Sequence, residues 1–448
     1  MESLALGRES RLLVVAPHCD DEVLGAGGLL HTVTRAGGAV RVVLLTNGDG
    51  YNRTALRGQF RRLRLPPERY IQFAYLRQRE TLAALAALGA SDSQVAFLGY
   101  PDRGLAAMWD DHWQPENPYR STFTRTTRSP YDNSRTRGAV FCGESLARDL
   151  EDIVREFRPT HVAVPHPHDD HGDHWAGCCF TLYALERLRL WGRLSSPPVV
   201  LAYLVHQGTW PRPRGYRPTL GLLPPRPYLH LPSVWMIADL PQEAVEQKYR
   251  ALLCHRSQMV FMGRYLSSFV RRNELFNLIQ PATVPRVDAG RIRVDGEPCD
   301  WEGIEVQIPV PARDTLARRL GRGADIRPVA ACRDSDFLYL LLELRRRVVD
   351  DYLYRVILYG MGRKRGLRRL RISVRVPDRV KVQGEGGWEP RGEIVARARN
   401  RCLEMAVPLL LLGRPERVFL GVVTRFRRLV VDRVAWQILD VGERHGGP

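Results

Sequence analysis

Two short clusters of histidine and carboxylate residues carry the chemistry that this sequence offers. The first spans Pro17–Glu22 (PHCDDE), and the second spans His166–His174 (HPHDDHGDH) and holds four of the 12 histidines in the chain. Imidazole and carboxylate groups are suitable ligands for a zinc-type divalent ion. Three protein ligands and one open position form the catalytic arrangement, in which the ion makes hydroxide available near neutral pH. The two clusters therefore predict a catalytic metal site.

The elements around the clusters indicate how they meet. Apolar runs predict buried strands at Leu12–Ala16, Val40–Leu45, Gln94–Leu98, Thr160–Val164 and Val199–Val205. Helical patterns lie at Glu22–Ala36, Arg79–Leu88, Ser145–Phe157, Asp173–Leu190 and Pro241–His255. This alternation predicts a Rossmann-like, doubly wound, mostly parallel α/β sheet. Each cluster follows a strand directly, so both are expected at the same edge of the sheet, where ligands bind in this fold.

The pattern changes near residue 296. Short alternating runs follow, at Phe337–Leu344, Tyr352–Leu358, Leu370–Val376, Val418–Val423 and Val430–Ile438. They predict a C-terminal antiparallel β-sandwich-like accessory domain over 296–448, after a catalytic domain over 1–290. Within the first domain, we expect the polar insertion 100–143 to line the site. The proline-rich segment 208–233 is expected to run over the surface, and the second domain either binds a glycan or partner or is structural.

The composition limits the partners. The 448 residues carry a net charge of +18, and only three of the 67 lysine and arginine residues are lysine, so 64 are arginine. The arginines are spread along the chain, which favours a coding bias over a nucleic-acid-binding stripe. We therefore expect no nucleic-acid partner, while peripheral contact with anionic surfaces remains open.

Targeting and redox features point to the cytoplasm. No apolar run approaches the ~18 residues of a membrane span, and the start lacks the pattern of a signal peptide. The eight cysteines form no C-x-x-C pair and fit free thiols in a reducing compartment. A cytoplasmic location is the expectation, and the oligomeric state cannot be read from the sequence.

With these motifs in place, the sequence resembles the LmbE-like (PIG-L) de-N-acetylase family. The family motif (P/A)-H-P-D-D-E matches Pro17–Glu22, and the motif H-x-D-H matches His171–His174. Two further stretches look like the family, one over Arg77–Asp102 and one over Lys248–Gln258. Cys19 stands where the family usually has proline, which loosens the metal-bearing turn and adds a redox-sensitive thiol without removing a ligand.

The resemblance covers about residues 10–260 and implies a hydrolase that acts on a linear amide C–N bond. Such an enzyme removes the N-acetyl group of an N-acetylglucosamine-type sugar or glycoconjugate with one divalent metal, zinc or alternatively ferrous iron. The metal ligands that the resemblance implies are His18, Asp21 and His174. Asp20 would be the general base, His171 would donate toward the oxyanion or the leaving amine, and Asp173 would orient His171. The implied contacts to the sugar are Arg77 and Asp102.

Two other functions remain open. The first is a non-catalytic, metal-containing glycan-binding protein on the same fold, and the intact Asp20 argues against it because a binding protein has no use for a base. The second is a different metal hydrolase such as a phosphoesterase, which usually needs a second metal and more carboxylates.

Several residues near the motifs have two interpretations each. Four residues of the insertion suit either the faces of a sugar or ordinary loop packing, namely Trp109, Trp113, Tyr119 and Arg120. His255 either reaches the site or completes a helix end. Asp169 and Asp170 either cap the next helix or support the ligands.

Overall fold

The computed structural model describes residues 1–51, 65–229, 231–311, 324–363, 366–375, 379–384, 394–427 and 429–442. Contacts divide the chain into two units, the first made of Met1–Pro225 with Ser233–Ile279 and the second of Arg226–Pro232 with Gln280–Pro448. The limits 1–290 and 296–448 stay a prediction about separately functioning domains. Within the described ranges, no helix combines the length and the apolar character needed to cross a membrane.

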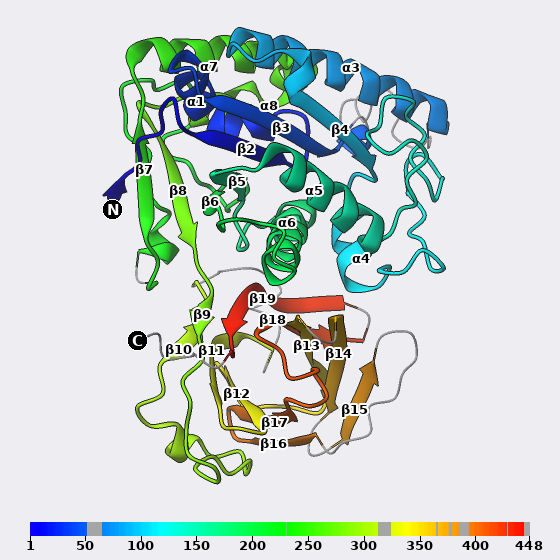
Figure 1. Ribbon diagram of the computed structural model, residues 1–448, viewed down its shortest axis with the longest axis vertical. Coiled ribbons are helices and arrows are strands. Elements are labelled where there is room, and N and C mark those ends of the chain that lie inside the picture. The colour runs from blue at the N-terminus through cyan, green and yellow to red at the C-terminus, as the bar shows by residue number, and fades with distance from the viewer. Residues whose placement is uncertain are drawn as a thin grey trace. The chain divides into compact units, whose positions relative to one another are not determined.

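The N-terminal unit is built on an eight-stranded sheet with the order β1-β7-β8-β6-β5-β2-β3-β4 (Figure 1). The strands are β1 (Glu2–Ser3), β2 (Arg11–Ala16), β3 (Ala39–Thr46), β4 (Val95–Tyr100), β5 (His161–Pro165), β6 (Val199–Tyr203), β7 (Trp235–Asp239) and β8 (Asn273–Ile279). Neighbouring strands pair in parallel except where β8 meets β6 and β7. The prediction of a doubly wound, mostly parallel sheet is confirmed, and its five predicted strands correspond to β2 through β6.

Helices cover both faces of this sheet. They are α1 (Asp21–Arg35), α3 (Pro67–Ala87), α4 (Leu105–Asp110), α5 (Gly143–Phe157), α6 (Gly172–Leu190), α7 (Gln242–Cys254) and α8 (Arg256–Leu266). One face carries α1, α3, α7 and α8, and the other carries α4, α5 and α6 (Figure 1). Helix α3 begins at Pro67 rather than at Arg79, because proline fits the first helical turn and its fixed φ is already helical. Arg77 therefore lies within the helix.

The strand order places the two clusters together. The chain runs from β2 to β3 on one side, whereas β5 pairs with β2 on the other side. The order of the strands thus reverses beside β2, and ligands of doubly wound sheets bind outside the carboxyl ends of the strands at such a point. Both the Pro17–Glu22 turn and the segment after β5 begin there.

The sequence patterns did not reveal the end of this unit. After the predicted helix, the chain continues into α8 and then into β8, which is inserted between β6 and β7. Strand β8 contains the fully buried Glu274, whose charge breaks the apolar pattern of a core strand. Glu274 is paired with Lys248 of α7 near Ala26, where α1 is kinked.

The C-terminal unit is a β-sandwich. One sheet has the order β10-β11-β12-β17-β16 and the other β15-β14-β13-β18-β19-β9. The strands are β9 (Ala282–Thr283), β10 (Val306–Ile308), β11 (Ile326–Arg333), β12 (Phe337–Leu344), β13 (Tyr352–Gly362), β14 (Gly366–Arg375), β15 (Arg379–Gly384), β16 (Val395–Arg399), β17 (Cys402–Pro408), β18 (Arg417–Phe426) and β19 (Leu429–Asp440). Alternate side chains such as Leu340 and Leu358 form the core between the sheets. The predicted antiparallel sheets are confirmed, although Val376, the last residue of one predicted strand, lies outside the described residues.

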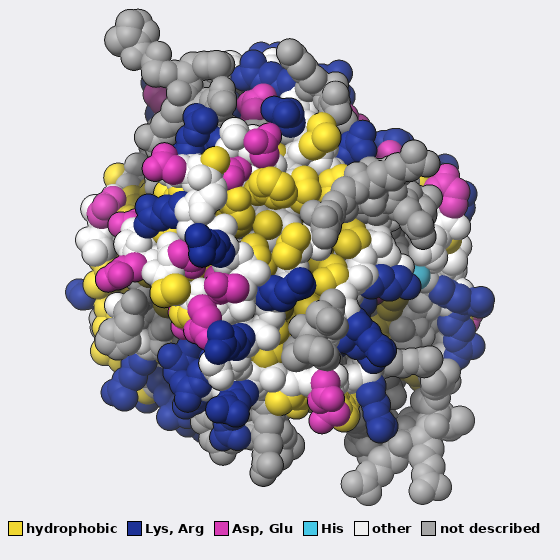
Figure 2. Space-filling model, turned by 90° about the horizontal axis from the view of Figure 1, so that it is seen from below, with side chains coloured by type: hydrophobic (Ala, Val, Ile, Leu, Met, Phe, Trp, Pro, Cys, Tyr) yellow, Lys and Arg dark blue, Asp and Glu magenta, His cyan; other side chains and the backbone are white. Residues whose placement is uncertain are grey.

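The distribution of basic side chains can be followed on one face of the molecule. On the face shown in Figure 2, lysine and arginine side chains stand among apolar and acidic ones, around a centre that is mainly apolar. This arrangement agrees with the dispersed arginines of the sequence.

Candidate active site

A cavity of about 200 Å³ lies beyond the carboxyl end of β2. Its walls are formed by His18, Asp20, Asp21, Leu24, Arg77, Asp102, Arg103, His171, His206, Gln258, Met262, Tyr265 and Leu266. Both sequence clusters contribute to these walls, as expected from the parallel strands. The cavity is therefore polar at its base and apolar along the side formed by α8.

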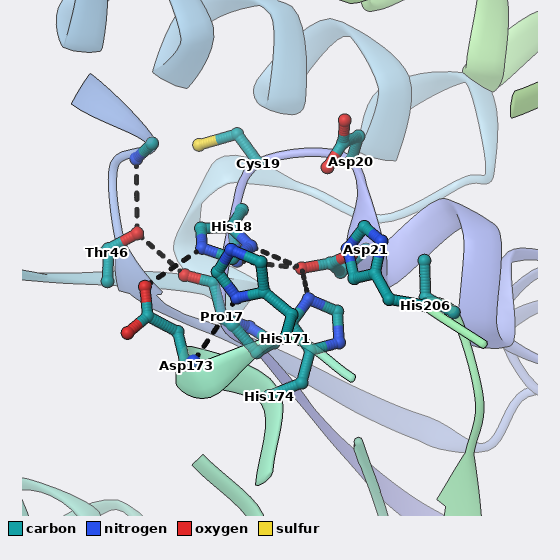
Figure 3. Close-up of polar contacts among 12 residues, drawn as sticks. Pro17, His18, Cys19, Asp20, Asp21, Thr46, His171, Asp173, His174 and His206 are labelled. Carbon is teal, nitrogen blue, oxygen red and sulfur yellow. Dashed lines mark hydrogen bonds and ion pairs between the residues drawn. The ribbon is translucent and has the colours of Figure 1, made fainter. Parts of the chain in front are cut away.

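Three side chains converge on one point at the base of the cavity. The Oδ2 atom of Asp21 lies 3.1 Å from Nδ1 of His18 and 3.1 Å from Nε2 of His174 (Figure 3). Nε2 of His174 has no hydrogen-bond partner within the described residues. Its contact with Asp21 is close but does not have the alignment of a hydrogen bond. Bonds of about 2.1 Å to a shared ion place neighbouring ligand atoms roughly 3.0–3.4 Å apart. These two distances are compatible with His18, Asp21 and His174 as ligands of one ion. The described residues also offer other candidate sets, including His18 with His171 and His174, and Asp21 with His174 and His206.

The charged groups at the base of the cavity also favour a bound cation. Burial lowers the pKa of His174, but the carboxylates of Asp169 and Asp21 outweigh this effect and raise the pKa to about 10. Burial raises the pKa of Asp21, but His174 and His18 hold it well below its usual range. The carboxylates thus favour positive charge between the imidazoles, which a divalent ion would supply.

Further carboxylates hold the two imidazoles from outside. Oδ2 of Asp169 lies 3.3 Å from Nδ1 of His174 and accepts the N–H of His206 at 2.9 Å. Oδ2 of Asp173 lies 3.2 Å from Nε2 of His18, and Oδ1 of Asp102 lies 3.4 Å from the same nitrogen. Carboxylates in such positions fix the orientation of histidine ligands and make them more basic. Asp169, for which the sequence left two roles open, faces His174, one of the expected ligands.

Asp20 occupies a strained position beside the ligands. Its φ of 134° lies in a region that non-glycine residues rarely adopt, and its N–H donates to Oε2 of Glu22 at 2.9 Å. Its Oδ2 lies 3.4 Å from Nη2 of Arg77, which also donates to backbone oxygens of Gly48 and Cys19. Burial raises the pKa of Asp20 to about 6 against the opposing effect of Arg77. A carboxylate with a pKa in this range can take up a proton near neutral pH.

His171 presents one nitrogen to the cavity. The backbone N–H of Asp173 donates to Nδ1 of His171 at 3.2 Å, so the neutral ring carries its proton on Nε2. Burial lowers the pKa of His171 to about 4, and the positive charge of His18 acts in the same direction. The carboxylate of Asp173 faces His18, so the predicted contact between Asp173 and His171 is made by the backbone instead.

Only part of the insertion 100–143 lines the cavity, whereas the sequence predicted that the insertion lines the site. Asp102 and Arg103 line the cavity. Trp109 and Trp113 do not line it, because they pack against the aromatic ring of Phe180 in the interior of the unit. The packing interpretation of these tryptophans is therefore the correct one.

His255 lies behind Asp20 rather than in the cavity wall. It is fully buried between α7 and α8, and its Nε2 lies 3.2 Å from Oε1 of Glu22. Since Glu22 also accepts the N–H of Asp20, His255 supports the strained turn indirectly.

Sequence reasoning missed His206 and the wall formed by α8. His206 follows β6 at the same edge of the sheet, and its ring centroid lies 4.6 Å from that of His174. One histidine without neighbouring carboxylates gave no motif, although its place after a strand was a usable signal. Gln258, Met262, Tyr265 and Leu266 form the opposite wall and lie in a segment whose fold the patterns did not reveal.

Comparisons with known proteins agree with the motifs. Residues 13–184 match the family described as PIG-L, GlcNAc-PI de-N-acetylase. The N,N'-diacetylchitobiose deacetylase from Pyrococcus horikoshii is 18% identical, with 60% of this chain and 84% of that chain covered and a TM-score of 0.38. The A40926 pseudoaglycone deacetylase is 19% identical, with 60% and 97% covered and a TM-score of 0.37. The 4-carboxy-2-hydroxymuconate hydratase from Pseudomonas putida is 19% identical, with 60% of this chain and 83% of that chain covered and a TM-score of 0.36.

No curated protein matches the chain significantly. The family match covers the segment that carries both clusters, so residues 13–184 are similar to the PIG-L (LmbE-like) deacetylases.

Proposed function

We propose that this chain hydrolyses the N-acetyl amide of an N-acetylglucosamine-type sugar or glycoconjugate and releases acetate and a free amine. The observation that carries the proposal is the position of Asp20. This carboxylate lines the cavity next to the ligand set, is held by Arg77, and is not one of the three converging ligand atoms. A protein that only bound a glycan would have no need of a general base next to the metal ligands.

The ligand set is the second part of the proposal. His18, Asp21 and His174 would hold one divalent ion, zinc or alternatively ferrous iron. When bound, such an ion polarises the amide carbonyl and lowers the pKa of water. Asp169 and Asp173 keep His174 and His18 oriented for this role.

The remaining residues divide the proton transfers between them. Asp20 takes the proton from the attacking water, and its raised pKa suits that step. Nε2–H of His171 donates to the developing oxyanion or to the leaving nitrogen. Arg77 and Asp102 line the cavity and are our proposed contacts to sugar hydroxyls, with Arg77 also holding Asp20 in place.

The test is acetate release by the full chain. Purified protein of known metal content is assayed against a panel of N-acetylglucosamine conjugates, with His174→Ala measured beside it. We expect acetate release by the wild type and the loss of both bound metal and acetate release in the variant. Bound metal in the wild type without acetate from any conjugate would contradict the proposal.

A further inference from the structure

Helix α8 carries four consecutive apolar residues, Met259–Met262, although only one side of the helix is covered. Gln258, Met262 and Leu266 recur every fourth residue and form a wall of the site cavity. Val260 and Phe261 lie away from that wall and are 75% and 53% exposed. Exposed runs of apolar residues are costly in a water-soluble helix unless they serve a function.

Positive charge flanks these two residues. Arg256 and Arg264 are exposed, and together with Val260 they form one stripe along the helix at a spacing of four residues. None of the residues of α8 is acidic. The guanidinium of Arg214 lies 4.2 Å from the centre of the Tyr265 ring and adds a third positive charge beside the helix.

We propose that the outer face of α8, formed by Arg256, Val260, Phe261 and Arg264, docks on an anionic lipid surface. Helices that lie in the plane of a membrane interface combine an apolar strip with arginine or lysine residues in this way. The apolar side chains enter the boundary of the acyl chains while the guanidinium groups pair with anionic headgroups. The net charge of +18 acts in the same direction.

A second copy of the chain is a poorer occupant of this face. A stable protein interface buries about 800 Å² on each partner, and one phenylalanine and one valine supply only a fraction of that area. In a two-fold dimer through α8, the same patch of each copy faces the other. Arg256 and Arg264 would then lie close to the arginines of the second copy, and like charges repel. An anionic surface removes this repulsion.

The position of α8 gives the docking a consequence for the site. Met262 and Tyr265 on the same helix line the cavity. A helix with its side chains is about 10–12 Å across, so docking through the outer face brings the cavity within about that distance of the headgroups.

Vesicle sedimentation of the full chain tests the proposal. Vesicles of phosphatidylcholine are compared with vesicles in which about one-third of the lipid is phosphatidylglycerol. We expect binding to the anionic vesicles only. The double variant Val260→Ser/Phe261→Ser should bind at least about tenfold more weakly, because two apolar side chains no longer enter the interface. The variant Arg256→Gln/Arg264→Gln should lose roughly fivefold for each arginine.

The chain offers a matched control in β19. Leu429 and Val430 are 70% and 46% exposed, so Leu429→Ser/Val430→Ser removes a comparable apolar pair elsewhere. We expect this variant to bind like the wild type, and unchanged thermal unfolding midpoints should show that all variants are folded. An equal loss in the control would overturn the assignment to α8.

Three further results would overturn the proposal. They are no binding to anionic vesicles, equal binding to both kinds of vesicle, and a dimer in light scattering that Val260→Ser/Phe261→Ser abolishes. Vesicle binding needs no substrate, so its failure is distinguishable from a failure of the proposed deacetylation.

Discussion

Lys248 and Glu274 form a buried ion pair, in which Nζ of Lys248 lies 2.6 Å from Oε1 of Glu274. The pair sits at the kink inside α1. Lys248 also donates to the carbonyl oxygen of Leu24 at 2.9 Å, and Glu274 accepts the N–H groups of Gly28 and Leu29 at 2.7 and 2.9 Å. The ion pair thus satisfies backbone groups at the kink of α1, the helix that begins with the proposed metal ligand Asp21.

Removing one partner of this pair should be costly. Lys248→Met leaves the carboxylate of Glu274 buried without its cation, and we expect the free energy of unfolding to fall by about 3–5 kcal/mol. Urea unfolding measures the change. The double variant Lys248→Met/Glu274→Gln should lose less than the sum of the two single variants, because the pair acts together. Strictly additive losses would contradict this coupling.

Asp20→Asn should separate catalysis from metal binding. We expect acetate release to fall about 10²–10⁴-fold, because asparagine cannot take the proton from water. Elemental analysis should find the same metal content as in the wild type, since Asp20 is not among the ligand atoms. Full activity in this variant would remove Asp20 from the role of general base.

Asp169→Asn should weaken metal binding without removing a ligand. Loss of such a carboxylate typically lowers metal affinity about 10–100-fold. Competition with a chelator measures the affinity. The neighbouring Asp170→Asn is the matched control, because Asp170 is exposed and accepts the N–H of Gly208 at 3.0 Å, whereas Asp169 is buried and faces His174. Equal effects of the two substitutions would contradict the role given to Asp169.

Cys19 should be unreactive in the folded protein. It is fully buried, and burial raises the pKa of its thiol to about 12, so the sequence-based expectation of a redox-sensitive thiol is not supported. Iodoacetamide should label the exposed Cys299 first and Cys19 only after unfolding, as peptide mass spectrometry can show. Rapid labelling of Cys19 in the native protein would show that the turn opens.

The sequence predicted those parts of the site that follow from local pattern. The place of His18 and His174 at the edge of the sheet could be predicted, because each stands in a dense motif directly after a strand. Their convergence follows from the parallel sheet, whose carboxyl ends share one edge. His206 obeys the same rule but stands alone, so its place after β6 was the one signal that could have indicated it.

Contacts between residues far apart in the sequence explain the features that the sequence did not predict. Strand β8 was missed because Glu274 looks too polar for a core strand, and its neutralising partner Lys248 comes from α7. The tryptophans of the insertion had two interpretations, since only the fold shows that Phe180 from α6 packs against Trp109. In both cases the deciding contact joins residues that are distant in sequence.

The strand order also determines when the site is completed during synthesis. The ribosome releases the N-terminal end first, so the three proposed metal ligands leave it before Glu274. Strand β8 comes last in the unit, yet it lies between β6 and β7 and supplies the residue that caps the kink of α1. The matched segment 13–184 holds the three proposed ligands but neither member of the ion pair. We therefore expect a nascent chain to contain these three residues early and to fix the kink of α1 only when β8 has been made.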